Sequence, residues 1–143
     1  MTIQHIDFAT PAFDEALALR NDILRVPLDL EFETKDILTE WGSHHMGLYD
    51  QYQTLQACLT LLPLNKQEVK MRQVAVAQAQ QGKGLGKTLV VASESFSKTC
   101  KFKKIVLHAR KSAVPFYKKL GYKVLGKMFK EVGIPHFKMY KNL

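Results

Sequence analysis

Cysteine is scarce in this chain of 143 residues, and neither Cys58 nor Cys100 stands in a spacing typical of a metal or redox site. Intracellular thiols usually stay reduced, so we expect no disulfide. No apolar run reaches the roughly 18 residues that a membrane-spanning helix needs. The first ten residues, MTIQHIDFAT, lack the basic flank and apolar core of a secretory signal. These absences predict a cytoplasmic protein with no bound metal and no membrane partner.

Acidic residues are scarce in the second half of the chain. Residues 66–143 contain three Asp or Glu against 18 Lys or Arg, whereas residues 1–65 contain ten against three. The first balance is +15 and the second is −7, which gives the net charge of +8. A basic half attracts anions, and an acidic half favours a cationic partner such as an amine. Nucleic acid is one anion that this charge allows, but no RNA- or DNA-binding motif accompanies the lysines, so we expect no nucleic-acid partner.

The composition is that of an ordinary globular domain. Hydrophobic residues make up 46% of the chain and charged residues 24%. We find no internal repeat, low-complexity tract or linker. We therefore expect one domain over residues 1–143, which is long enough to bury its own core.

The first half predicts a strand, a helix and a hairpin. Thr10 and Pro11 are a suitable cap and first position for a helix that extends to about Arg25, with its apolar residues on one face. Residues 26–43 are irregular, with a short helix near 35–41. The expected strands are 2–8, 44–50 and 53–62, the last two joined by a turn at Asp50–Tyr52.

The second half has clearer periodicity. Residues 84–101 place Leu85, Leu89, Ala92, Phe96 and Cys100 on one helical face. Ser112 is a candidate cap for a short helix with Pro115 in its first turn, and Gly121 suits the left-handed position after it. The expected strands are 70–77, 103–109, 122–130 and 135–142. This order predicts an α/β (α+β) fold with at least one parallel strand pair in a mixed sheet.

A glycine-rich stretch, QQGKGLGKT, follows the strand at 70–77 and opens the helix. A nucleoside-triphosphate loop needs glycine where Gln81 stands, and a dinucleotide fingerprint needs glycine at Lys87 or Leu89. Both motifs fail. An ordinary glycine-rich turn stays open as an interpretation. A loop in which backbone N–H groups and the positive end of the helix hold phosphates also fits the stretch.

Two motifs resemble the GNAT superfamily of N-acetyltransferases. Gln81-x-x-Gly84-x-Gly86 after a Val-Ala-Val strand resembles the loop that holds the acyl-CoA pyrophosphate in that superfamily. HARKSAVPFYKKLGY, residues 108–122, resembles its next motif through Ala109, Arg110, Ala113, Tyr117 and the Leu-Gly-Tyr ending. The resemblance covers roughly residues 53–143. The chain departs from the pattern at Gln78, where proline is common, and at Arg110, where asparagine is common. The ElaA-like branch is a fainter resemblance, carried by residues 19–30 and 131–141.

The resemblance implies a fold and a donor site. The sheet would be mixed and mostly antiparallel, with two splayed parallel central strands and helices on both faces. The pantetheine arm of acetyl-CoA would lie between those strands like an added strand. The cofactor-binding residues implied are Val74, Ala75, Val76, Gln81, Gly82, Lys83, Gly84, Leu85, Gly86, Lys87, Arg110, Ala113 and Phe116.

The resemblance also implies direct transfer of the acetyl group from acetyl-CoA to an amine. Tyr117 would be the catalytic proton donor to the departing sulfur. The base is open: strand 70–77 lacks the glutamate frequent in the family, and the candidates are a water chain or Glu31, Glu33, His44, His45, Glu131 and His136. A cationic acceptor would suit the acidic residues within 26–50.

We therefore expect an N-acetyltransferase acting on a primary amine of a small molecule or protein. A non-catalytic CoA-binding or regulatory module with the same fold is the alternative. The sequence does not specify the oligomeric state, and a homodimer is one outcome.

Overall fold

A seven-stranded sheet organises the computed structural model, which describes residues 1–31 and 33–143. Its strands lie in the order β1-β2-β3-β4-β5-β7-β6, and only β4 and β5 run parallel. Their bounds are β1 (Thr2–Ile6), β2 (His44–Tyr49), β3 (Leu55–Pro63), β4 (Glu68–Val76), β5 (Lys104–Arg110), β6 (Lys123–Glu131) and β7 (Ile134–Asn142). The mixed, mostly antiparallel sheet expected from the sequence is confirmed.

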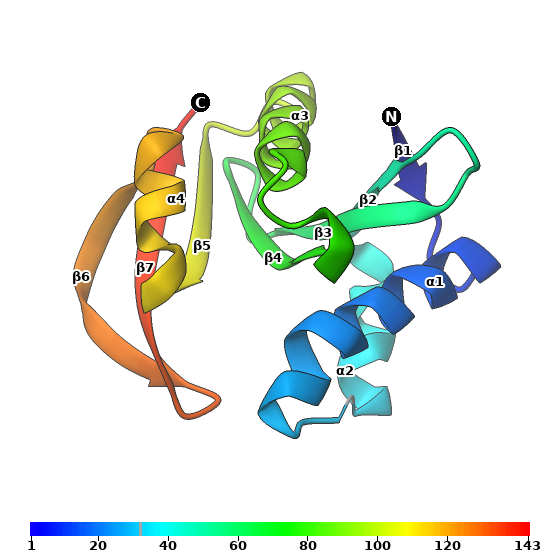
Figure 1. Ribbon diagram of the computed structural model, residues 1–143. Coiled ribbons are helices and arrows are strands. Elements are labelled where there is room, and N and C mark those ends of the chain that lie inside the picture. Colours follow the sequence, from blue (N-terminus) through cyan, green and yellow to red (C-terminus); the bar gives the residue numbers. More distant parts are fainter. Residues whose placement is uncertain (32) are drawn as a thin grey trace.

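Helices cover both faces of this sheet (Figure 1). Helices α1 (Pro11–Arg20) and α2 (Thr34–Leu38) lie on one side, and α3 (Leu85–Thr99) and α4 (Val114–Lys119) lie on the other. The core divides in the same way. Leu89 of α3 and Tyr117 of α4 pack with buried residues of β2 to β5 and β7, whereas Phe13 and Ala16 of α1 pack with Cys58 and Ala75.

The first helix begins as predicted. The Thr10 hydroxyl oxygen accepts a hydrogen bond from the Phe13 N–H at 3.3 Å, and Pro11 occupies the first turn. Beyond Arg20 the chain continues as one wide π-type turn over Asn21–Arg25 and a 3-10 turn over Val26–Leu28. This change of winding carries Arg25 toward β4, where its side chain takes part in the site described below.

The predicted cap of the fourth helix is wrong. A 3-10 turn over Lys111–Ala113 precedes α4, Ala113 occupies the cap position, and no side chain caps the helix. The reason is chemical, since a Ser112 cap would accept from an N–H three residues later and Pro115 has none. Pro115 does lie in the first turn, and Gly121 follows the helix at φ +93°, both as expected.

Candidate active site

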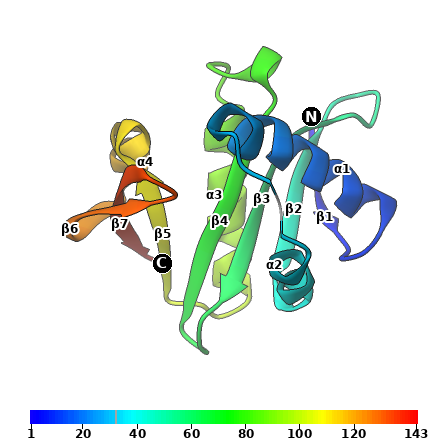
Figure 2. The same cartoon turned by 90° about the horizontal axis from the view of Figure 1, so that it is seen from below.

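The parallel strands β4 and β5 separate halfway along their length. Their ladder joins Glu68–Met71 to Lys104–Leu107 and ends there, although β4 continues to Val76 and β5 to Arg110. Figure 2 shows the two strands diverging, with β5, β7 and β6 turned away from the rest of the sheet. Beyond the last pair, the two facing edges do not bond to each other, so they can bond to something placed between them.

A bulge in β4 lies at the point of separation. Cys58 of β3 pairs with Ala75 and Thr60 pairs with Arg72, so Leu59 alone stands opposite both Gln73 and Val74. Gln73 has φ +56°, which is uncommon outside glycine, and its side-chain oxygen accepts a hydrogen bond from Arg25 at 3.2 Å. The bulge bends β4 away from β5 and aims new side chains into the space between them.

A cavity of about 630 Å³ opens at this separation. Its walls come from both strands, the segment after α1, the start of α4 and the β6–β7 turn. Such a volume suits a small-molecule site. The cavity therefore lies where the sheet provides unpaired strand edges, rather than at an outer surface.

The loop before α3 presents backbone donors beside the end of β4. Gly82 and Gly84 adopt φ of +80° and +83°, and the Gln81 side-chain amide donates to the Val76 carbonyl at 3.0 Å. No side chain caps α3. The first-turn N–H groups at Leu85, Gly86 and Lys87 are therefore left for water or an anion. This geometry explains what the glycines do: they turn the chain so that successive amides face outward together.

Tyr117 is the buried phenol of the cavity. The residue is 8% exposed, and its ring packs edge-on against Phe116 and Tyr122, with ring centroids 5.0 and 5.6 Å away. Burial raises the pKa of Tyr117 to about 12. The hydroxyl is consequently protonated at neutral pH and available as a hydrogen-bond donor.

A second titratable group lies in the cavity wall on the α1 side. Nδ1 of His108 lies 3.0 Å from Oε1 of Glu131, and Nε2 of His136 lies 3.6 Å from the other carboxylate oxygen. Burial acts to raise the pKa of Glu131, but the hydrogen bond from His108 and the positive groups nearby hold it below its ordinary value. A carboxylate that fixes one imidazole nitrogen leaves the other nitrogen to exchange a proton.

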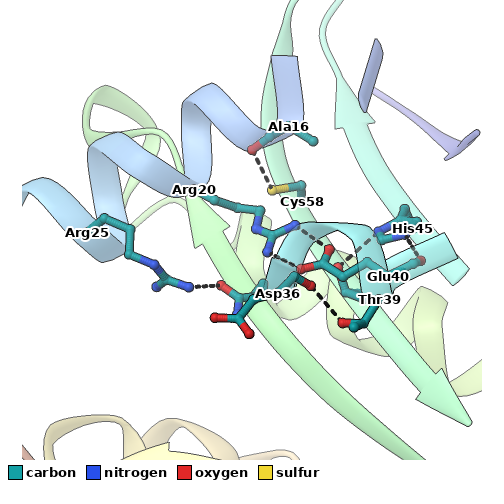
Figure 3. A network of polar contacts seen from close by, with 10 residues as sticks. Ala16, Arg20, Arg25, Asp36, Thr39, Glu40, His45 and Cys58 are labelled. Carbon is teal, nitrogen blue, oxygen red and sulfur yellow. Dashed lines mark hydrogen bonds and ion pairs between the residues drawn. The ribbon is translucent and has the colours of Figure 1, made fainter. Parts of the chain in front are cut away.

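A buried polar network supports the segment on that side (Figure 3). Arg20 of α1 makes two hydrogen bonds to the Glu40 carboxylate, at 2.8 and 2.7 Å, and the Arg20 side chain is 2% exposed. His45 of β2 bridges the Glu40 carbonyl at 3.0 Å and the Thr60 hydroxyl at 3.1 Å. The network joins α1, the turn before β2, and the sheet, so it fixes the wall from which Arg25 extends.

The structure brings most sequence-predicted residues to one region. Val74, Arg110, Ala113 and Tyr117 line the cavity. Val76 and Phe116 both lie 3.6 Å from the position that a Gly86 Cβ would occupy, so the loop and α4 meet beside the strand. Ala75 differs, because its side chain packs under α1, which leaves only its backbone for a ligand.

The candidate bases divide into two groups. Glu31, Glu33, Glu131 and His136 line the cavity, whereas His44 and His45 do not. His44 packs edge-on against Phe96 of α3, and His45 belongs to the buried network. His108 was missed by the sequence analysis. Strand alternation gave a signal for it, since Ala109 points into the α3 side and its neighbours must point the other way.

In residues 1–31 and 33–143, no group of three or more His, Cys, Asp and Glu side chains is placed to hold a metal ion. None of the helices in that described part is long and apolar enough to cross a bilayer.

Comparison with known proteins gives a family and a fold. A family model described as an acetyltransferase (GNAT) domain matches residues 35–143. The uncharacterized N-acetyltransferase YjcF of Bacillus subtilis is 36% identical over 74 residues, which are 51% of this chain and 53% of YjcF. The match therefore spans about half the length of that relative.

Solved structures match over the whole chain. A Lactobacillus plantarum protein assigned to the N-acetyltransferases is 26% identical, with a TM-score of 0.86 and coverage of 100% of this chain and 99% of that one. Escherichia coli ElaA is 20% identical with a TM-score of 0.84, covering 99% of both chains. An aminoglycoside 6'-N-acetyltransferase complexed with coenzyme A is 17% identical, with a TM-score of 0.83 and coverage of 99% and 97%. ElaA is thus one of several structural neighbours, and the similarity does not assign this chain to the ElaA-like branch. The family model matches more than half of the chain and the parallel strands β4 and β5 separate in the expected way, so the chain belongs to the GNAT acetyltransferase family.

Proposed function

We propose that this protein transfers an acetyl group directly from acetyl-CoA to a primary amine. The observation that carries the proposal is the cavity at the separation of β4 and β5, with Tyr117 in its wall and an uncapped helix N-terminus beside it. An amine nucleophile, a thioester and a departing thiolate need a narrow site with proton-transferring groups on two sides, and this cavity has them.

The donor half of the site fits acetyl-CoA. The edge of β4 at Val74 to Val76 has no pairing with β5, so it would face the amide groups of the pantetheine arm, although the Val76 carbonyl already accepts a hydrogen bond from Gln81. The amides of residues 81–87 would bind the pyrophosphate, with Lys83 and Lys87 adding charge. Gly86 supports this fit, because its absent Cβ leaves space between Val76 and Phe116. Solved family structures include one with coenzyme A and one with acetyl-CoA bound.

The acetyl group gives the reaction its electrophile. A backbone N–H near Val76 would polarise the thioester carbonyl, a type of donor often worth roughly 3–4 kcal/mol. The amine nitrogen forms a bond to the acetyl carbon, the carbon–sulfur bond breaks, and the electron pair leaves with the sulfur. Tyr117 donates a hydrogen bond to that sulfur. The proton lost by the amine must go to a base on the other side.

His108 is the base that the geometry favours. Glu131 holds Nδ1 of His108, so Nε2 is the nitrogen that can accept the proton of the amine. Both His108 and Tyr117 line the same cavity, from opposite faces of the sheet. This arrangement separates the group that removes a proton from the group that donates one. Of the other candidates in the cavity wall, Glu31 and Glu33 are exposed, Glu131 is the partner of His108, and His136 is engaged with Glu131 and the Ile134 carbonyl.

A non-catalytic CoA-binding module with the same fold is the second candidate. It shares the donor half of the site and needs neither Tyr117 nor His108. The observation that favours it is that β4 carries no carboxylate after Glu68, so residues 70–76 lack the glutamate that is frequent in the family at this strand.

Binding and turnover separate these two functions. Thermal stabilisation is measured with acetyl-CoA and with ATP, and thiol release is then followed with a panel of amines. The Cys100→Ser variant is used, since Cys100 is exposed and would itself react with the thiol reagent. Stabilisation by acetyl-CoA followed by amine-dependent thiol release supports the enzyme. Stabilisation without release on any amine supports the binding module, and stabilisation by ATP alone refutes both.

A further inference from the structure

Four basic side chains meet on the α1 side of the cavity. Val69 and Met71 of β4 are buried on the α3 side, so Lys70 and Arg72 between and after them point the opposite way. Arg110 of β5 follows Ala109 in the same manner. Arg25 reaches the same space from the turn after α1 and is held by Gln73. All four line the cavity.

Three of these four side chains have no ion-pair partner in the part of the chain that the structure describes. Among residues 1–31 and 33–143, no carboxylate lies within 4.0 Å of the side-chain nitrogens of Lys70, Arg72 or Arg110. Two carboxylates near these side chains already have partners: Glu131 of the cavity wall binds the two histidines, and Glu40, behind that wall, binds Arg20. Arg72 stands one residue past the last β4–β5 pair, where the cavity opens.

The pKa values of two of these basic groups are lowered, as expected for cations that lie close together. Burial and the neighbouring charges of Arg20, Arg110 and Arg72 lower the pKa of Arg25, against an opposing effect of Glu40. Burial, Arg72 and Lys138 lower the pKa of Lys70, against Glu131. Burial is the largest cause for both groups, and the neighbouring cations add a repulsion that an anion placed there would relieve.

The acidic residues of the cavity are placed differently. Glu31, Glu33 and Asp36 are exposed, and Glu33 pairs with Lys35 at 3.3 Å. The four basic side chains are half-buried. Because solvent screens exposed charges much more than partly buried ones, the basic residues dominate the potential inside the cavity. The expectation of a cationic acceptor, which rested on those acids, becomes the rival outcome.

We propose that the acceptor is a primary amine that also carries an oxyanionic group, a carboxylate or a phosphate, bound by Arg72 and Arg110 beside the acetyl-transfer site. The proposal rests on the proposed function, because it names the substrate class of that reaction. Guanidinium groups bind both oxyanions through paired N–H donors. We do not place the phosphates of acetyl-CoA between Arg72 and Arg110, because the loop proposed to bind them follows Val76, at the C-terminal end of β4.

The test measures binding and turnover with four amines. O-phosphoethanolamine and β-alanine carry the two oxyanions, ethanolamine carries none, and putrescine is a dication. Each is titrated calorimetrically into the CoA-bound protein and assayed with acetyl-CoA. The variant is Arg72→Gln, and Lys127→Gln is the matched control, because it removes the same charge from an exposed residue outside the cavity.

We expect at least one oxyanionic amine to bind and react about tenfold better than ethanolamine and putrescine, and Arg72→Gln to remove that preference. The comparison of the first two amines identifies the oxyanion. Acetyl-CoA affinity and the control variant stay unchanged.

The proposal is overturned if the protein prefers putrescine or ethanolamine, or if Arg72→Gln binds the oxyanionic amines as well as the unmodified protein does. Either result would leave the proposed acetyl transfer intact. Arg72-dependent binding without thiol release on any amine instead refutes the proposed function and retains the anion site. Failure of both oxyanionic amines to bind overturns the substrate class directly.

Discussion

His108 and Glu131 meet across a strand that separates them. His108 belongs to β5 and Glu131 ends β6, with β7 between them in the sheet, yet Nδ1 and Oε1 are 3.0 Å apart. His136 of β7 approaches the other carboxylate oxygen at 3.6 Å. Phe129 packs against both imidazoles. The pair is thus positioned by three strands at once.

The base prediction follows from this pair. His108→Gln removes the proton acceptor, and we expect turnover to fall by about 10²–10⁴-fold with unchanged acetyl-CoA affinity. Glu131→Gln keeps the imidazole but weakens its orientation, so a smaller loss is expected. Steady-state kinetics and calorimetric titration of acetyl-CoA measure the two effects. Full activity of His108→Gln would falsify the assignment and favour a water-mediated base.

The Tyr117 prediction concerns both rate and pH. Tyr117→Phe should lower turnover at least about tenfold and spare acetyl-CoA binding, because only the donor to sulfur is lost. With its pKa raised to about 12, the phenol stays protonated throughout the working range. The pH profile of kcat/KM should therefore show no fall caused by Tyr117 up to about pH 10. A decline below that pH that disappears in Tyr117→Phe would contradict the raised pKa.

Gly84, at the cap of α3, and Gly86, in its first turn, allow a matched comparison. Gly84 has φ +83°, so Gly84→Val should strain the loop and weaken acetyl-CoA binding. A Cβ at Gly86 would make only ordinary contacts of 3.6 Å with Val76 and Phe116. Gly86→Ala should therefore leave the thermal unfolding temperature unchanged and weaken only the binding of acetyl-CoA. Unaltered binding by both variants would remove the loop from the donor site.

The buried ion pair predicts a stability effect without a direct catalytic one. Glu40→Ala leaves the Arg20 guanidinium, 2% exposed, without its carboxylate, and we expect about 3–5 kcal/mol of lost unfolding free energy. Urea denaturation measures the loss. Glu33→Ala is the control, because Glu33 and Lys35 form an exposed pair whose removal should change stability little. Equal stability of the two variants would contradict the importance of the buried network.

His45 predicts how stability depends on pH. Burial is the main cause of its lowered pKa, with Arg20 and His44 adding to it and Glu40 opposing it. As the pH falls below about 6.5, the unfolded state takes up this proton before the folded state does, so the unfolding free energy decreases down to the lower folded pKa. In His45→Gln the slope between pH 7 and 5 should be shallower. His44, also with a lowered pKa, accounts for part of the remaining slope.

Local patterns were sufficient for much of the fold. The cap at Thr10, the glycine loop and the final hairpin depend on residues a few positions apart, so the sequence contains their signals directly. The prediction of a Ser112 cap was wrong because Pro115, in the first turn, has no N–H that the serine hydroxyl could bind.

The α1 side of the site could not be predicted in this way. Its contacts join residues that are 20 to 48 positions apart, such as Arg20 with Glu40, Arg25 with Gln73, and His108 with Glu131. They depend on strand register and on the bulge at Gln73, which a single sequence does not specify. His136 was named as a candidate base, but its partner emerged only when β7 placed it opposite Arg110 and Phe129.

The four-pair ladder between β4 and β5 has a mechanical consequence. The ladder that joins the two halves of the sheet lies between residues 68–71 of β4 and 104–107 of β5. A ligand that bonded to the free edges of both strands would extend this ladder. Ligand binding should then slow amide hydrogen exchange well beyond the residues it touches, including the C-terminal hairpin of β6 and β7. The donor substrate would then stabilise the folded sheet while it is bound, and this stabilisation would be lost when it leaves.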